Sequence, residues 1–341
     1  MLYITVSLLV IANTINIGAD LGAMASSAQM LLGQPDLFWH FLITGFVIFL
    51  EVFVPYRTYS RILKYLALTL FSYVLAALVV RLDWGMIFRS TLIPHLEFST
   101  DYLLNIVAVL GTTISPYLFF WQASEEVEEE ILNGQIQDMG IGKPCMTRRG
   151  VSIMNGDTVV GMSYSQVIMF FIIVTTAATL HAGGITKIQT ASQAAEALRP
   201  LAGDLTYLLF TVGIIGTGLL AVPVLAGASA YAMTEMVGVK EGLSKKFGQA
   251  PVFYIVIATS TLIGMSLDWV GINPISALYY SAALNGLVAP PLMALIIMIA
   301  NRKDIMGRFI NSRLSNVLGW VIVLIMTLVG VALIVSLATG Q

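Results

Sequence analysis

A proline interrupts an apolar segment where three hydroxyl side chains lie close together. Residues 111–122 read GTTISPYLFFWQ, with Pro116 directly after two threonines and a serine. Proline has no backbone N–H and disrupts the helix around it, so a carbonyl of the preceding turn loses its donor. In lipid that loss costs several kcal/mol unless a neighbouring helix or a ligand satisfies the carbonyl. The break at 112–117 is therefore a candidate binding site.

A second polar group lies in the first apolar segment, which contains NTINIGAD at residues 13–20. Asn13, Asn16 and Asp20 are spaced by three and four residues, so they share one face of a helix. A carboxylate within a membrane span is costly and indicates a functional site by default. The alternative is that Asp20 hydrogen-bonds a neighbouring helix and only stabilises the bundle. Both interpretations remain open from these residues alone.

The composition indicates a polytopic membrane protein. Of 341 residues, 57% are hydrophobic and 11% are charged, whereas soluble domains carry about 25% charged residues. A single cysteine, Cys145, excludes an internal disulfide. No phosphate loop, His/Cys metal cluster or Ser–His–Asp arrangement is visible, so we do not expect an enzyme, a resident cofactor or a nucleic-acid partner. The expected surroundings are a lipid bilayer, and no obligate protein partner is indicated.

Apolar segments long enough to span a bilayer predict an all-α fold with about nine transmembrane helices in one domain, residues 1–341. A short amphipathic helix is expected within the connector 182–203, at TASQAAEAL. The predicted spans are 2–31, 36–56, 62–81, 99–130 with the break at 112–117, 158–181, 204–236, 251–269, 273–300 and 315–338.

Lysine and arginine predict the orientation, because cytoplasmic connectors are enriched in both. Thirteen of the 17 basic residues fall in alternate connectors, which places those connectors in the cytoplasm. The remaining four are Arg81, Arg89, Lys187 and Arg199. The thirteen are Arg57, Arg61, Lys64, Lys143, Arg148, Arg149, Lys240, Lys245, Lys246, Arg302, Lys303, Arg308 and Arg313.

Three further features have mainly structural interpretations. The glycines and alanines of 204–236 indicate close helix packing, with Pro223 as a kink. Asn285 and Gly286 precede Pro290 and Pro291, which favours a packing kink over a second discontinuity. The glutamate run at 125–130 is typical of a solvated helix end, and a cation-attracting vestibule is the alternative.

Four stretches in order along the whole chain resemble the Nramp family of divalent metal transporters. They are NTINIGADLGAMA (13–25), LGTTISPYLFFWQ (110–122), GIIGTGLLAVPVLAGASAYAMTE (213–235) and ALNGLVAPPLMALIIMIANRKDIMG (283–307). The resemblance implies a LeuT-like fold of two inverted repeats, with the chain covering family helices three to eleven. It also implies that the first two family helices, which supply a metal-binding carboxylate, are absent, so we expect a fragment or truncated chain. Reading the coding DNA upstream of Met1 would test this.

The resemblance places the transported metal at the proline break. The family's sixth helix reads Met-Pro-His, with a metal-binding thioether, whereas this chain has Ser115-Pro116-Tyr117. Hydroxyl and carbonyl oxygens favour hard cations such as Mg²⁺ and Mn²⁺. We therefore expect metal contacts from four residues and a freed carbonyl, that of Thr112. The four are Thr112, Thr113, Ser115 and Tyr117. The polar pathway or helix packing would involve Asn13, Asn16, Asp20, Gln122 and Asn285.

Proton-handling groups of the family are mostly replaced in this chain. The histidines of the sixth helix fall on Tyr117 and Gln122, and the third-helix glutamate falls on Ala23, so that only Asp20 remains. This combination resembles the Nramp-related magnesium transporter branch. It predicts transport of Mg²⁺ or Mn²⁺ by alternating access without strict proton coupling, in a multi-pass protein of the plasma or inner membrane. The alternatives are a proton-coupled Mn²⁺/Fe²⁺ importer and a truncated membrane protein that does not transport.

Overall fold

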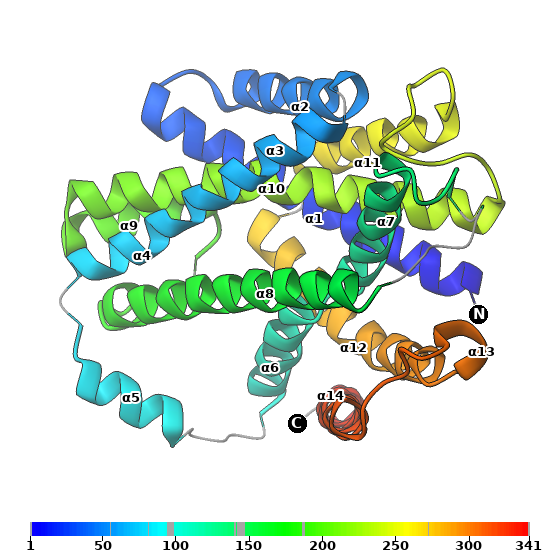
Figure 1. Cartoon of the computed structure of the whole chain (residues 1–341). Helices are drawn as coiled ribbons and strands as arrows, with labels where there is room; N and C mark the ends of the chain where they lie inside the picture. Colours follow the sequence, from blue (N-terminus) through cyan, green and yellow to red (C-terminus); the bar gives the residue numbers. More distant parts are fainter. Residues whose placement is uncertain are drawn as a thin grey trace.

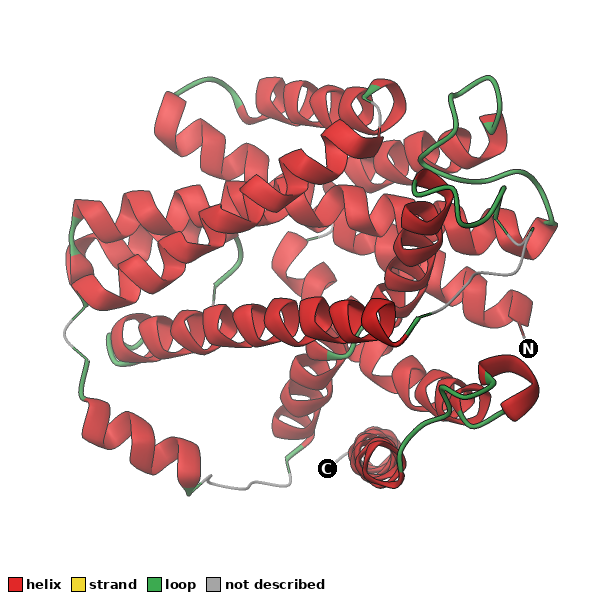
Figure 2. Ribbon diagram, viewed as in Figure 1, coloured by secondary structure: helices red, strands yellow, loops and turns green. Residues whose placement is uncertain are grey.

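The computed structural model of the protein is helical (Figure 1, Figure 2) and describes residues 2–54, 56–80, 82–93, 99–139, 141, 147–185, 188–271 and 273–339. Among these residues the one β-type pairing is an isolated bridge between Asp138 and Ile141. The elements are α1 (Leu2–Leu32), α2 (Asp36–Phe53), α3 (Tyr56–Leu66), η1 (Ala67–Leu70), α4 (Phe71–Val79), α5 (Trp84–Leu92), α6 (Thr100–Thr113), α7 (Pro116–Leu132), α8 (Arg148–Thr176), η2 (Ala177–His181), α9 (Ala191–Ala202), α10 (Asp204–Val237), α11 (Pro251–Trp269), α12 (Pro274–Ala300), α13 (Lys303–Met306) and α14 (Arg313–Thr339).

Eight of the nine predicted spans are confirmed in place and order. Eight helical segments of the described chain are long and apolar enough to cross a membrane, and α11 contains a shorter apolar helix. The span predicted at 62–81 consists of three consecutive pieces, α3, η1 and α4. The amphipathic helix in the connector 182–203 is confirmed as α9, whereas α5 was not predicted.

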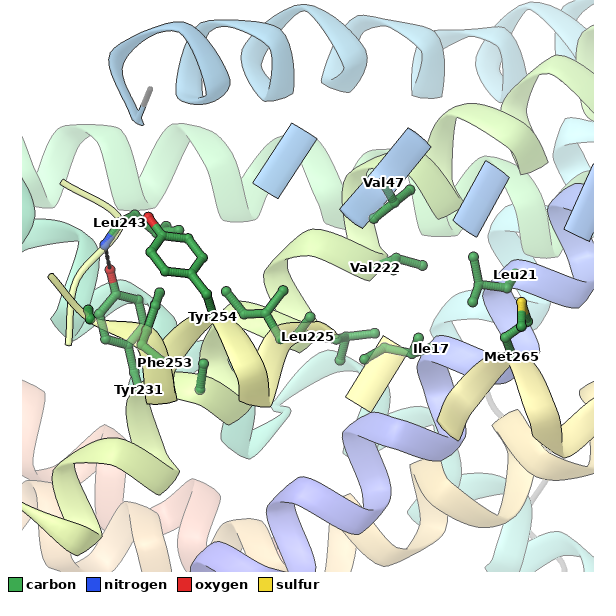
Figure 3. Close-up of a cluster of buried hydrophobic side chains, with 14 of the residues drawn as sticks. Ile17, Leu21, Val47, Val222, Leu225, Tyr231, Leu243, Phe253, Tyr254 and Met265 are labelled. Carbon is green, nitrogen blue, oxygen red and sulfur yellow. Dashed lines mark hydrogen bonds between the residues drawn. The ribbon is translucent and has the colours of Figure 1, made fainter. Parts of the chain in front are cut away.

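The centre of the protein is formed by α1 and α10, which pack against each other (Figure 1). α1 also packs against α2, α11 and α12, so that its apolar side chains are enclosed on several sides. Figure 3 shows the main cluster of buried apolar residues, including Ile17, Leu21, Val222, Leu225 and Phe253. Lipid tails are as apolar as these side chains, so close packing rather than water exclusion stabilises such contacts.

Glycines of α10 allow other helices to approach its backbone, as the sequence predicted. Each faces a side chain so close that a Cβ atom would collide with it. Gly213 faces Tyr73, Gly216 faces Thr69, Gly218 faces Met24 and Gly227 faces Trp121. The two prolines near the middle of α12, Pro290 and Pro291, lie within a continuous helix. The interpretation of these prolines as a second helix break is therefore wrong, and the structure favours the packing interpretation.

The connectors predicted to be cytoplasmic lie on one side of the protein. Val54, at the end of α2, lines a cavity with the loop residues 243–248. Arg148 and Arg308, from two other connectors, line a second cavity. Lys245 and Asp138 also form an ion pair between the α10–α11 loop and the segment after α7, so the four connectors lie next to one another. Their position on the cytoplasmic face stays a prediction from their lysines and arginines.

Candidate functional site

The break lies between Thr113, where α6 ends, and Pro116, where α7 begins. Ser115 is 2% exposed, and its hydroxyl lies within hydrogen-bond distance of two carbonyls of the last turn of α6. Its Oγ is 2.6 Å from the Gly111 oxygen and 3.1 Å from the Thr112 oxygen, and it donates to both. The expectation that Pro116 leaves the Thr112 carbonyl free is therefore wrong, because Ser115 satisfies it.

The end of α6 is held in place by a close contact with α12. A Cβ atom at Gly111 would overlap the Ala282 oxygen and come within 2.5 Å of the Gly286 nitrogen. In return, a Cβ atom at Gly286 would overlap the Val107 oxygen. The break thus starts from a fixed backbone position. Asn285, next to Gly286, is 3% exposed.

Tyr117 begins α7 on the other side of the break and interacts electrostatically with Asp20 of α1. Asp20 also interacts with Tyr73 of α4, whose hydroxyl lies 3.5 Å from the Thr217 hydroxyl of α10. The Asp20 carboxylate is half-buried and has no hydrogen-bond partner among the residues that the structure describes. The structure therefore places Asp20 within electrostatic range of two tyrosines, Tyr117 at the break and Tyr73 on α4.

Tyr73 and Thr217 were missed by the sequence analysis. Tyr73 lies within the apolar segment FSYVLAALV. A single tyrosine in such a span does not indicate a functional site. Thr217 lies in the glycine-rich part of α10, which predicted packing. The one signal for both was a hydroxyl in the middle of a span. Their positions follow from the packing of α4 on α10, which the sequence does not reveal.

Asn13 and Asn16 contact two different helices, although they share a face of α1. The Asn13 amide donates to the Leu225 oxygen at 3.2 Å and to the Ser229 hydroxyl at 3.0 Å, both on α10. The Asn16 side-chain oxygen accepts a short hydrogen bond from Ser281 on α12. These contacts favour the packing interpretation for both asparagines. Asp20 is the member of the trio that lies beside the break.

Three other predicted site residues do not join this group through their hydrogen bonds. The hydroxyls of Thr112 and Thr113 donate to the Val109 oxygen at 2.9 and 2.7 Å, so each bonds back to its own helix. Gln122 is exposed, and its amide donates to Glu126 at 2.9 Å. The Ser115 hydroxyl likewise bonds to carbonyls of α6, so hydrogen bonding does not separate it from the two threonines, and metal contacts from the four residues stay a prediction. No group of three or more His, Cys, Asp or Glu side chains that could hold a metal occurs in the described part of the chain.

One glutamate of the run at 125–130 is fully buried at the cytoplasmic end of α7. Glu128 accepts hydrogen bonds from the Tyr231 hydroxyl at 2.8 Å and from the Ser244 backbone at 3.2 Å. The Tyr231 hydroxyl in turn accepts from the Leu243 backbone at 3.1 Å (Figure 3). The solvated interpretation is therefore wrong for Glu128. This carboxylate joins α7 to α10 and to the α10–α11 loop.

A second contact attaches the same loop to the segment after α7. Lys245 forms an ion pair with Asp138, and this hydrogen bond lowers the pKa of the Asp138 carboxyl. Lys245 also donates to the Glu241 backbone oxygen at 2.9 Å. Glu241 accepts from Thr234 at 2.6 Å, and burial raises the pKa of its carboxyl. The second half of the broken helix is thus fixed to α10 at its cytoplasmic end, while its other end bears Tyr117.

Comparisons with known proteins cover nearly the whole chain. A family model described as "Natural resistance-associated macrophage protein-like" (Nramp) matches residues 1–336. The divalent metal cation transporter MntH of Clostridium acetobutylicum is 24% identical over 272 residues, which are 79% of this chain and 58% of that protein. MntH of Deinococcus radiodurans is 24% identical over 323 residues, which are 92% of this chain and 68% of that protein. The chain thus spans little more than half the length of the first relative.

Solved structures show the same fold. A mutant of the Eremococcus coleocola manganese transporter superimposes with a TM-score of 0.64 at 16% sequence identity. The match covers 96% of this chain and 70% of that structure. A second mutant of the same transporter gives a TM-score of 0.62 over the same shares. The expected LeuT-like helical transporter fold is therefore confirmed.

Proposed function

This chain belongs to the Nramp family, and from that premise we propose that it carries a divalent metal cation across a membrane, past the break between α6 and α7. The observations that support the proposal are the break between α6 and α7 and the electrostatic interaction of Tyr117, in the first turn of α7, with Asp20 of α1. A broken helix exposes polar backbone at membrane depth, which is tolerated where it lines a path for a substrate. Two similar proteins are described as a divalent metal cation transporter and a manganese transporter, which agrees with this function.

The donor atoms beside the break favour a hard cation, Mn²⁺ or Mg²⁺. Ser115, Tyr117 and Asp20 offer hydroxyl, phenol and carboxylate oxygens, and none offers sulfur. Such oxygen donors suit Mg²⁺ and Mn²⁺, and Mg²⁺ retains part of its hydration shell when bound. The manganese transporters among the relatives make Mn²⁺ at least as good a candidate as Mg²⁺.

We propose further that transport is not strictly coupled to protons. A proton path through a membrane needs titratable groups in series. Among the proton-handling positions that the family resemblance implies, Asp20 is the one that retains a carboxylate. The competing candidate is a proton-coupled Mn²⁺ importer, which a half-buried Asp20 beside the break also suits.

Uptake into proteoliposomes that contain a pH-sensitive dye tests both proposals. We expect Mn²⁺ and Mg²⁺ to enter faster than into protein-free liposomes, with no acidification of the interior. Acidification in step with Mn²⁺ entry would favour the proton-coupled importer. Entry at the rate of protein-free liposomes would contradict transport by this chain and favour a non-transporting membrane protein.

Replacing Ser115 with methionine should change the preference among cations. A thioether at this position favours softer metals, so we expect the ratio of Cd²⁺ to Mg²⁺ uptake to rise roughly tenfold. Ser115→Ala is the matched control, because it also removes the hydrogen bonds to the Gly111 and Thr112 carbonyls but adds no sulfur. A ratio that rises equally in both variants, or in neither, would show that Ser115 does not lie in the cation path.

A further inference from the structure

A polar cavity lies on the cytoplasmic side, away from the break in α6–α7. Its volume is about 360 Å³. The first turns of α8 form one wall, and the connector between α13 and α14 forms the other. The lining residues are Arg148, Val151, Ser152, Asn155, Arg308 and Phe309.

The chemistry of the lining suits an anion. Two arginines, from segments far apart in the sequence, line one cavity together with Ser152 and Asn155, and no acidic residue is among the described residues that line it. The Arg308 guanidinium lies 5.0 Å from the centre of the Phe309 ring, which orients its planar face. Paired guanidiniums bind phosphate oxygens in a bidentate manner.

The cavity lies where two spanning helices leave the apolar region. Exposed apolar side chains of α8 begin at Ile153 and continue through Val159, and those of α14 begin at Leu314. The two arginines therefore lie near the first residues of two spanning helices, with the apolar side chains of Val151 and Phe309 beside them. Basic pockets between spanning helices on the cytoplasmic side attract anionic lipids.

We propose that this cavity binds the phosphate group of an anionic phospholipid in the cytoplasmic leaflet. A bound head group bridges two parts of the bundle that otherwise pack separately, because α8 packs mainly on α4 whereas α14 packs on α12 and α6. The lipid thus connects α8 to the connector before α14. The cavity is separate from the proposed cation path. A result that contradicts lipid binding would therefore leave the transport proposal unaffected.

The test measures lipid binding to the purified protein by native mass spectrometry. Phosphatidylglycerol is titrated into the protein in a neutral detergent, with phosphatidylcholine as the zwitterionic comparison. In R148Q/R308Q we expect phosphatidylglycerol to bind more weakly, by about fivefold for each arginine removed. The matched control is R149Q/R313Q, which removes the same charge from the first turns of α8 and α14 at residues that do not line the cavity.

Equal weakening in both double variants would overturn the proposal, because it would indicate a general charge effect. Inorganic phosphate that displaces phosphatidylglycerol and binds as tightly alone would overturn the lipid assignment in favour of a free anion. Should R148Q/R308Q fail to fold, R148K/R308K retains the charges but loses the bidentate geometry. We expect intermediate binding from it, and unchanged binding would contradict a guanidinium–phosphate contact.

Discussion

Replacing Gly111 with alanine is expected to lower the free energy of unfolding by about 3 kcal/mol, the upper end of the usual range for an overpacked core. The added methyl group would overlap the Ala282 carbonyl and press on the backbone of Gly286. These are backbone atoms of a packed helix, so no side chain can rotate away to make room. The Gly111 carbonyl also accepts from Ser115, so we expect cation uptake to fall with stability.

Thermal unfolding in detergent checks this expectation, with Gly161→Ala as the matched control. Gly161 lies in α8 with no atom within 4 Å of the position of a Cβ, so alanine there can only improve helix propensity, by up to about 1 kcal/mol. Equal unfolding temperatures for the two variants would contradict the close contact between α6 and α12. Gly286→Ala should behave like Gly111→Ala, because its methyl group would meet the Val107 carbonyl.

The sequence predicts the position of the helix break but not how its carbonyls are satisfied. Pro116 has no N–H, which favours a discontinuity just before it, although Pro290 and Pro291 lie inside the continuous helix α12. Whether a ligand, a neighbouring helix or the Ser115 hydroxyl satisfies the freed carbonyls depends on a side-chain rotamer. The observed rotamer directs Ser115 to Gly111 and Thr112. That choice is fixed by tertiary packing around a residue that is 2% exposed.

For the polar residues in the spans, too, the sequence predicts the local spacing but not the partners in other helices. The spacing of Asn13, Asn16 and Asp20 correctly predicts a helix with polar side chains close together. Their partners lie more than two hundred residues away for both asparagines, on α10 and α12. Spacing within one helix cannot specify which helices surround it. The apolar length of each span, by contrast, is a local property, and the spans were therefore predicted in the right order.

Replacing Glu128 with alanine is expected to destabilise the protein by about 2 kcal/mol, because the buried Tyr231 hydroxyl loses its acceptor, at a cost of roughly 1–3 kcal/mol, and the more accessible Ser244 N–H also loses one. The donors are the Tyr231 hydroxyl and the Ser244 backbone, 103 and 116 residues away in sequence. The first visible effect should be faster amide hydrogen exchange at residues 242–246, since this loop is attached to α7 through Glu128.

Glu129→Ala is the control for this effect, because Glu129 is exposed on the same turn of α7. Surface substitutions of this kind usually change stability by less than about 0.5 kcal/mol. A double-mutant cycle with Tyr231→Phe then isolates the contact, and the double variant should lose less stability than the sum of the single variants. Additive losses, or unchanged exchange in the loop, would show that α7 is held to α10 by other contacts. The cycle matters for transport because α7 bears Tyr117 at its other end, so a helix fixed at Glu128 limits how far the break can open toward the cytoplasm.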